Sequence, residues 1–309
     1  MSVYTPDRVL DLIRRGLPLA KAELAHIELQ GLCLDGADFS RAYMRVANLA
    51  NASCQKANFS GTVLIRGWLV GAILAGADLS RAQLTAARLE RANLREVEAV
   101  GARLHGAILD GADASLAQLE GANLEDCSGR RAVMQAANLV KANLSFSDWS
   151  EADFSSAKLV GANLDGANLT RAKLAGAQLD RARLTRVRLA AADLTSADAL
   201  GSNLTEAYLA DANFTAAELD TAIAHLAYAH NANFTQASLF GSSWDGAILS
   251  DANFTQANLV DASFEGADLS GAVFEGTDVR GATLTDAIGL SEAQRRGLRD
   301  LGALNVPTA

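Results

Sequence analysis

The chain has 309 residues, of which 50% are hydrophobic and 20% are charged, and its formal net charge is −9. This apolar content supports a large core and argues against disorder, while the negative charge argues against direct nucleic-acid binding. Three cysteines are too few, and too irregularly spaced, for a disulfide scaffold. The first residues show no secretion signal and no apolar run is long enough to span a membrane, so we expect a cytoplasmic protein without membrane contact.

The first predicted element is a short helix over residues 6–16. Thr5 followed by Pro6 is typical of a helix start, and Gly16 is typical of a helix end. Because this helix comes directly before a long repeat, we interpret it as a cover for the first coil.

A five-residue repeat follows and keeps one register from Leu24 to Leu284. Large apolar residues occupy 46 of the 53 positions whose numbers end in 4 or 9, which we call position i. Alanine occupies 42 of the 53 positions two residues earlier, at i−2. Because side chains of an extended segment alternate, i and i−2 share one face and the chain must turn before the next pentapeptide. We therefore predict that i and i−2 point inward and that the other three positions face solvent.

A second spacing predicts the number of sides in each coil. Phe214, Phe234, Phe254 and Phe274 recur every 20 residues, so four pentapeptides per coil would stack these rings. The prediction is an all-β solenoid, a four-sided β-helix of about 13 coils. Exchanges of large i residues for small ones at Gly129, Ala224 and Ala229 leave two alternatives at 125–131 and 222–230, a bulged coil or a regular one.

The last predicted element is a helix over residues 291–301, where Ser291 and Gln294 have the spacing of a capping box. The open ends of a β-helix expose unpaired strand edges, so both terminal helices are interpreted as end caps. The predicted division is a cap over residues 1–18, one continuous repeat domain over 19–286, and a cap with its tail over 287–309.

The repeat resembles the pentapeptide-repeat family, A(D/N)LXX, over residues 22–286. This resemblance implies a right-handed quadrilateral β-helix. The opening residues TPDRVLDLIRRGLPLAKAELAHIELQGLCLDGADFSRA also look like the start of pentapeptide-repeat proteins found with bacterial type VI secretion systems. That second resemblance implies an accessory role in assembling or loading the secretion spike.

No residue pattern predicts catalysis, a cofactor site or a metal site, so we expect a protein that is not an enzyme. His225 and Asp245 occupy equivalent positions one coil apart and are interpreted as neighbouring surface groups. Cys54 and Cys127 fall at inward positions and are expected to be inert core thiols, whereas Cys33 points outward.

Two groups of large apolar residues at outward positions are candidate protein-interaction surfaces, because exposed apolar patches mark such sites. The first group consists of Tyr43, Val63, Ile65, Trp68, Val70 and Ile73. Within it, Trp68 is the leading candidate, and Arg88 is expected one coil above it. The second group consists of Tyr208, Tyr228 and Ile248, which are spaced by 20 residues and should form one column.

Charge is uneven along the repeat. Residues 171–188 have a net charge of +5, whereas residues 189–279 contain 13 acidic residues and no Lys or Arg. Such a carboxylate density resembles the axial charge density of duplex DNA. The candidate residues for DNA mimicry are Asp211, Asp251, Asp261 and Asp268.

Two functions therefore remain open at the level of sequence. One is a protein-protein interaction scaffold, with a secretion spike component as its partner. The alternative is a DNA mimic that binds DNA gyrase or topoisomerase, as the resemblance to the fluoroquinolone- and albicidin-resistance branch of the family implies. A homodimer formed through an end cap is compatible with either function.

Overall fold

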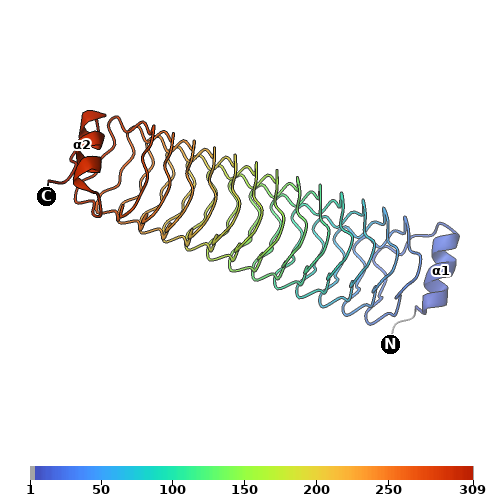
Figure 1. Ribbon diagram of the computed structural model, residues 1–309. Coiled ribbons are helices and arrows are strands. Elements are labelled where there is room, and N and C mark those ends of the chain that lie inside the picture. The colour runs from blue at the N-terminus through green and yellow to red at the C-terminus, as the bar shows by residue number, and fades with distance from the viewer. Residues whose placement is uncertain (1–3, 309) are drawn as a thin grey trace. The chain divides into compact units, whose positions relative to one another are not determined.

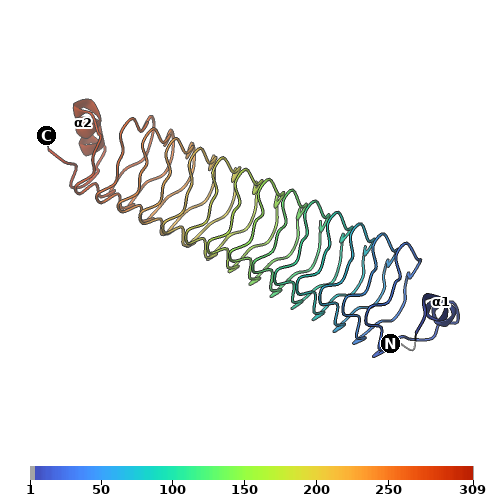
Figure 2. The ribbon, with the colours of Figure 1, turned by 90° about the horizontal axis from the view of Figure 1, so that it is seen from below.

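The computed structural model describes residues 4–308 and divides into two compact units, unit 1 (Met1–Lys158) and unit 2 (Leu159–Ala309). Within unit 1, the first coils follow the helix α1 (Pro6–Arg14), which lies at the blue end of Figure 1. Within unit 2, the coils lead to the helix α2 (Glu292–Asp300) at the red end, and Figure 2 shows the same coils from below. Each unit is a four-sided β-helix in its own right.

The backbone closes one coil every 20 residues. In unit 1, Asn48 is bridged in parallel to Trp68, and Trp68 is bridged to Arg88. The Trp68 N–H donates to the Ala47 carbonyl at 2.9 Å, and the Leu49 N–H donates to the Trp68 carbonyl at 2.7 Å. Each side of a coil contributes one such rung, so across residues 4–308 the β-structure consists of single parallel rungs rather than long strands. Because 20 residues hold four pentapeptides, the predicted four sides are confirmed.

The interior is formed by positions i and i−2, as the repeat predicts. Leu164, for example, is fully buried, and alanines at i−2 are buried through both units. The predicted phenylalanine stack is present in unit 2. Ring centroids are 5.1 Å apart for Phe214–Phe234 and for Phe234–Phe254, and 5.5 Å apart for Phe254–Phe274.

Each corner of a coil is a four-residue turn. The Ala42 N–H donates to the Phe39 carbonyl at 2.9 Å, and Arg41, the second central residue, has φ of 55°. A positive φ at this position is the mark of a type II turn, which favours glycine. Glycine has a second role where a neighbour leans over it: a Cβ on Gly246 would lie 2.8 Å from Cδ2 of Leu226, one coil earlier.

The side chain at i−1 holds the corner in place. Asn58 Oδ1 accepts the Ser60 N–H at 3.0 Å, and Asp78 Oδ1 accepts the Ser80 N–H at 2.8 Å. Short side chains with an acceptor atom form this kind of turn readily. The frequent Asn and Asp at i−1 therefore stabilise the corner, although corners also form after other residues such as Tyr208.

The coil does not bulge at either of the two uncertain segments. The rungs Ser128–Asp148 and Tyr228–Ile248 continue the ladders through 125–131 and 222–230. A Cβ on Gly129 would overlap the ring of Trp149 one coil later, so the missing side chain leaves room for the indole. A distorted coil is thus the wrong alternative, because a small residue in one coil is paired with a large one in the next.

The buried indoles are also satisfied as hydrogen-bond donors. Trp149 Nε1 donates to Ser147 Oγ at 2.7 Å, and Trp244 Nε1 donates to Ser242 Oγ at 3.0 Å. Both serines replace the usual alanine at i−2. Since a buried polar group without a partner is destabilising, the Ser-X-Trp spacing is what allows tryptophan inside the coil.

Both predicted helices are present. The helix α1 spans Pro6–Arg14, and the Thr5 hydroxyl accepts the Arg8 N–H at its start. The helix α2 spans Glu292–Asp300 and begins with the predicted capping box of Ser291 and Gln294. No helix in the described residues is long and apolar enough to cross a membrane. After α2 the chain adds one more rung that the sequence did not predict, because the Leu304 N–H donates to the Ala282 carbonyl at 2.7 Å.

Replacement of Leu164 with Asp should destabilise unit 2 by at least ~3 kcal/mol, because the carboxylate would be buried without a partner. The control is Leu200→Asp, at a site that is 40% exposed. It should change stability by about 0.5 kcal/mol or less. Chemical denaturation of both variants measures the difference, and equal stabilities would contradict the inward assignment of position i.

The pairing of Gly129 with Trp149 predicts a non-additive pair of substitutions. Gly129→Ala alone should destabilise the fold by about 1–3 kcal/mol, because the added methyl overpacks the core against the indole. In a Trp149→Leu background the same change should have little effect, since the ring is gone. A double-mutant cycle by denaturation measures this coupling, and additive effects would show that the two residues do not share one space.

Candidate protein-interaction surfaces

Trp68 lies on the outside of unit 1 and is 46% exposed. The Arg88 guanidinium carbon lies 4.9 Å from the centroid of the indole, within the range of a cation–π interaction. Arg88 Nε and Nη2 in turn donate to Glu90 Oε1 at 2.9 and 2.6 Å. One face of the indole is therefore covered by a cation of the same chain, and we call these three residues the Trp68 surface.

The other members of the first candidate group are not gathered around Trp68. Tyr43 and Val63 are successive rungs of one ladder, Trp68 belongs to the next ladder, and Ile73 belongs to a third. Successive ladders lie on successive sides of the coil. Ile65 and Val70 occupy half-buried corners between these sides. A flat partner therefore cannot contact all six residues at once.

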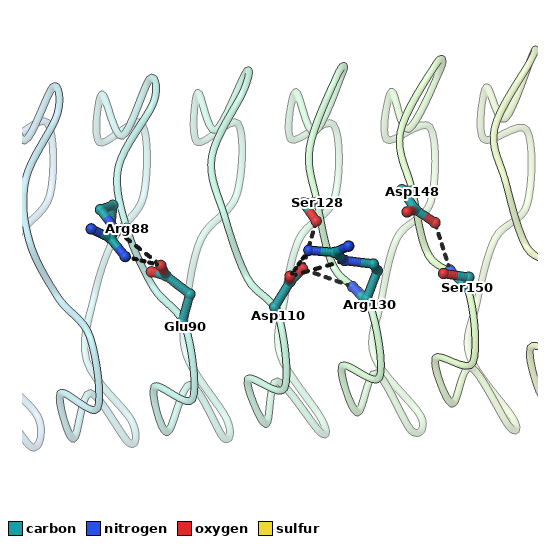
Figure 3. Close-up of polar contacts among 7 residues, drawn as sticks. All are labelled: Arg88, Glu90, Asp110, Ser128, Arg130, Asp148 and Ser150. Carbon is teal, nitrogen blue, oxygen red and sulfur yellow. Dashed lines mark hydrogen bonds and ion pairs between the residues drawn. The ribbon is translucent and has the colours of Figure 1, made fainter.

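A polar hollow lies at the corner that follows the Trp68 ladder, further along unit 1. Figure 3 shows the polar contacts of Asp110, Ser128 and Arg130 at this corner. Arg130 Nε and Nη2 donate to Asp110 Oδ2 at 3.0 and 2.7 Å, and Ser128 Oγ donates to Asp110 Oδ1 at 2.6 Å. Arg131 and Glu151 also line the hollow, and Arg131 Nε donates to Glu151 Oε2 at 2.9 Å. The hollow has a volume of about 370 Å³.

The ion pairs of this hollow are internal to the coil. Burial favours a raised pKa for Asp110, but the hydrogen bonds from Arg130 and Ser128 outweigh it and hold the pKa below its ordinary value. A carboxylate stabilised in its charged form by two donors is a poor general acid or base near neutral pH. The hollow is therefore a structural feature rather than a catalytic site.

The second candidate group does form one surface. Tyr208, Tyr228 and Ile248 are successive rungs of a single ladder in unit 2, and we call them the tyrosine column. The two tyrosine rings are stacked, with centroids 4.9 Å apart and planes 7° from parallel. Leu226, at the corner beside the column, is 62% exposed and has φ of 57°. Ile223, on the side before that corner, is 42% exposed.

None of the three residues of the tyrosine column is Asn or Asp, the corner-forming residues found at 22 of the 53 i−1 positions. Isoleucine has no acceptor atom, and the tyrosine hydroxyl lies at the far end of its ring. Neither residue can accept the i+1 N–H as Asn and Asp do elsewhere. A hydrogen bond of this kind contributes about 0.5–1.5 kcal/mol. The three positions therefore lack the corner hydrogen bond, while the stacked tyrosine rings add a contact between adjacent coils.

Two histidines flank the column, but their geometry does not support catalysis. Ser243 Oγ donates to Asp245 Oδ2 at 2.9 Å, so the contact of 2.7 Å between His225 Nε2 and Ser243 Oγ has the imidazole as donor. In a Ser-His-Asp hydrolase the histidine accepts the serine proton, and the aspartate contacts the other ring nitrogen. Within residues 4–308 no group of three His, Cys, Asp or Glu side chains could hold a metal ion.

Many carboxylates of the acidic segment are part of the corners. Asp268 Oδ1 accepts the Ser270 N–H at 2.9 Å, in the same way as Asp193, Asp198 and Asp278 accept theirs. A second form links adjacent coils: Asp245 Oδ1 accepts the Glu265 N–H at 3.1 Å and the Ser263 hydroxyl. This form was not predicted from the sequence, where its signal is a serine 18 residues after an aspartate.

The four candidate aspartates do not form one strip. Asp211 and Asp251 lie on the same corner two coils apart, Asp261 lies on another corner, and Asp268 lies on the side that carries the tyrosine column. Asn231 Nδ2 donates to Asp211 Oδ1 at 2.7 Å. Asp211, Asp251 and Asp261 are exposed, whereas Asp268 is half-buried.

The basic residues before the acidic segment are partly neutralised. Arg183 is paired with Asp165, and Arg186 Nε donates to Glu206 Oε2 at 2.7 Å. The hydrogen bond from Arg186 holds the pKa of Glu206 below its ordinary value. The net charge counted over residues 171–188 therefore overstates the free positive charge on this part of the surface.

The cysteines lie where the repeat predicts. Cys54 and Cys127 are buried, and burial raises the pKa of each thiol to about 12. Thiols with so high a pKa are poor nucleophiles. Cys33 is exposed and its Sγ contacts Asp35 Oδ2 at 3.6 Å.

Comparison with known proteins identifies the family. The sequence profile described as pentapeptide repeats matches segments that together cover residues 22–186, 188–223 and 247–286. The chain therefore belongs to the pentapeptide-repeat family, and its fold is the right-handed β-helix. The stretch between the last two matched segments, 224–246, contains Leu226, Tyr228 and Trp244.

Solved structures of pentapeptide-repeat proteins are similar in sequence. HetL, involved in heterocyst differentiation regulation in the cyanobacterium Nostoc sp. strain PCC 7120, is 28% identical over 93% of this chain and 98% of its own, with a TM-score of 0.24. QnrB1, a plasmid-mediated fluoroquinolone resistance protein studied in a trypsin-treated form, is 19% identical over 74% of this chain and 95% of its own, with a TM-score of 0.35.

A third similar structure is a pentapeptide repeat protein of the Arabidopsis thaliana thylakoid lumen. It is 24% identical over 49% of this chain and 74% of its own, with a TM-score of 0.13. No curated protein matches this chain significantly. These similarities assign no activity to the chain.

The exposure of Trp68 predicts a small effect of truncation on stability. Trp68→Ala should lower stability by about 1 kcal/mol or less, the range of an exposed cation–π contact. Trp149→Ala, at a fully buried indole, should lower it by about 3–5 kcal/mol. Thermal and chemical denaturation compare the two, and a large loss in Trp68→Ala would show that the indole supports the coil.

Proposed function

We propose that this protein is a non-catalytic scaffold that binds another protein through the tyrosine column. The observation that carries the proposal is the replacement of three successive corner-forming residues by Tyr208, Tyr228 and Ile248. Tyr208, Ile248 and the neighbouring Leu226 are exposed, and Tyr228 between them is half-buried. Aromatic anchors dominate the energetics of protein interfaces. The Trp68 surface is a second contact in the same proposal.

Site-specific crosslinking in cells of the source organism tests this function. A photoreactive phenylalanine at Tyr228 should capture one partner, and the same group at Val273, which is also exposed in unit 2, should not. Tyr228→Ala should weaken binding of that partner by ~2 kcal/mol or more, the range of interface hot spots. Equal capture at the two sites would contradict the proposal.

The opening residues give this proposal a specific form, an accessory protein of a type VI secretion system. Capture of a secretion spike component at Tyr228 or Trp68 would support that form. Capture of a different protein would be consistent with the scaffold function but would contradict the role in type VI secretion.

The second candidate is a DNA mimic that binds DNA gyrase, and the specific observation in its favour is the 91-residue segment 189–279 without Lys or Arg. If it holds, the purified protein should alter gyrase supercoiling, and reversal of Asp211, Asp251 and Asp261 to Lys should abolish the effect. Asp268 is tested separately, because its corner hydrogen bonds make Asp268→Lys destabilising. Supercoiling that is the same with and without the protein would rule out this candidate.

The remaining structural roles are part of the proposal. The helices α1 and α2 are proposed to cap the β-helix, and Gln294 Nε2, which donates to the Ala272 carbonyl at 2.7 Å, supports this role for α2. The domain over 19–286, the count of about 13 coils, the cytoplasmic location and a homodimer formed through an end cap stay predictions. Size-exclusion chromatography with light scattering measures the oligomeric state.

A further inference from the structure

The tyrosine column lies between two corners that carry negative charge. One corner holds Asp211 and Asp251, and the other holds Asp245 and Glu265. The segment 189–279 supplies no Lys or Arg to balance them. An apolar strip with carboxylates along both edges is the surface that this part of unit 2 presents.

The Trp68 surface of unit 1 shows what the tyrosine column lacks. There the exposed aromatic ring is covered by Arg88, which its own chain supplies. On the tyrosine column, the rung before Tyr208 is Arg188, but the next two rungs are Tyr228 and Ile248 and bring no cation. A cation that contacts Tyr228 together with the neighbouring carboxylates would have to be supplied by another molecule, because the adjacent rungs are Tyr208 and Ile248.

The two nearby histidines, His225 and His230, do not supply a cation to Tyr228. His225 Nε2 lies 3.8 Å from Asp245 Oδ2, and His230 Nδ1 lies 3.8 Å from Asp251 Oδ2. Each histidine already contacts a serine hydroxyl, at 2.7 Å for His225 and 3.0 Å for His230. Both therefore face their own corners, and His230 is 6.3 Å from Tyr228, centroid to centroid, in a tilted arrangement.

We propose that the tyrosine column binds a basic amphipathic helix of the partner protein. The apolar side chains of the helix would pack on Tyr228, Ile248 and Leu226, and its Lys or Arg side chains would pair with Asp211 and Asp251. Three rungs span ~10 Å, which is the length of about two helical turns and suits anchors at i, i+3 or i+4, and i+7. A second copy of this chain is a poorer occupant, because two such acidic surfaces repel each other.

This inference rests on the proposed function and adds the chemical class of the partner. If the partner crosslinked at Tyr228 contacts it through a segment without Lys or Arg, the inference fails while the scaffold function stands. If no partner is captured there, the scaffold function itself fails. The two failures are thus distinguishable.

The direct test uses the full chain and two designed 14-residue helices, one of leucine and lysine and one of leucine and glutamate. Calorimetry should show saturable binding of the lysine peptide and none of the glutamate peptide. Tyr228→Ala should weaken binding at least ~10-fold, about 1.4 kcal/mol. The exposed-site control Val273→Ser should leave binding unchanged.

Charge and fold are tested by two further variants. Asp211→Asn with Asp251→Asn should weaken binding and reduce its dependence on salt, whereas Glu275→Gln, elsewhere on unit 2, should do neither. Ile248→Asn restores the usual corner residue, so it should weaken binding without loss of thermal stability. That combination separates a binding role from a structural one.

Three results would overturn the proposal. They are equal binding of both peptides, equal affinities of Tyr228→Ala and Val273→Ser, and a wild-type dimer that Tyr228→Ala dissociates. The last result would make a second copy of the chain the occupant of the column.

Discussion

The narrow interior of the coil, which gives each pentapeptide room for one large and one small side chain, is the constraint on which the structure depends. Leucine at i and alanine at i−2 meet it at most positions, because side chains of one coil lie directly against those of the next. At one exchange the volumes are paired: Gly129 makes room for Trp149, and Ser147 accepts the indole N–H. At Ala99 and Ala114 the exchange leaves a small apolar cavity of about 20 Å³ inside unit 1, and the five-residue period continues without a break.

This dependence explains what could be predicted from the sequence. Period, inward positions, number of sides and both helices follow from local patterns such as the 20-residue spacing of Phe214 and Phe234. The regular coil at Gly129 could not be predicted from its own pentapeptide, because the compensating Trp149 lies 20 residues later. The candidate site shows the same limit: the spacing of Tyr208 and Tyr228 predicts a column, whereas Ile73 is close to Trp68 in sequence but lies on another side.

The corners decide how much of the surface charge is available to a partner. Four aspartates accept a backbone N–H of their own corner through Oδ1, namely Asp193, Asp198, Asp268 and Asp278. Asp245 accepts a backbone N–H of the next coil. Their negative charge remains, but their positions are fixed by the turn and distributed over several sides. A count of acidic residues per length therefore overstates the likeness to a strip of phosphates. The exposed corner pair of Asp211 and Asp251 is the part of this charge that lies beside an apolar surface.

The outward side chains are the ones that can contact other molecules. Among them, the residue at i−1 tells most about a binding role, because it can also form the corner hydrogen bond. Asn or Asp occupies 22 of the 53 i−1 positions and can accept a corner N–H, whereas an apolar residue there lacks this hydrogen bond. A single exchange of this kind is compatible with drift. The tyrosine column has three such residues in one ladder, beside Leu226, which is 62% exposed at a positive-φ corner, and between two acidic corners. Asn or Asp at the three i−1 positions would add the corner hydrogen bond, and the proposed binding role of the tyrosine column would account for the apolar residues found there instead.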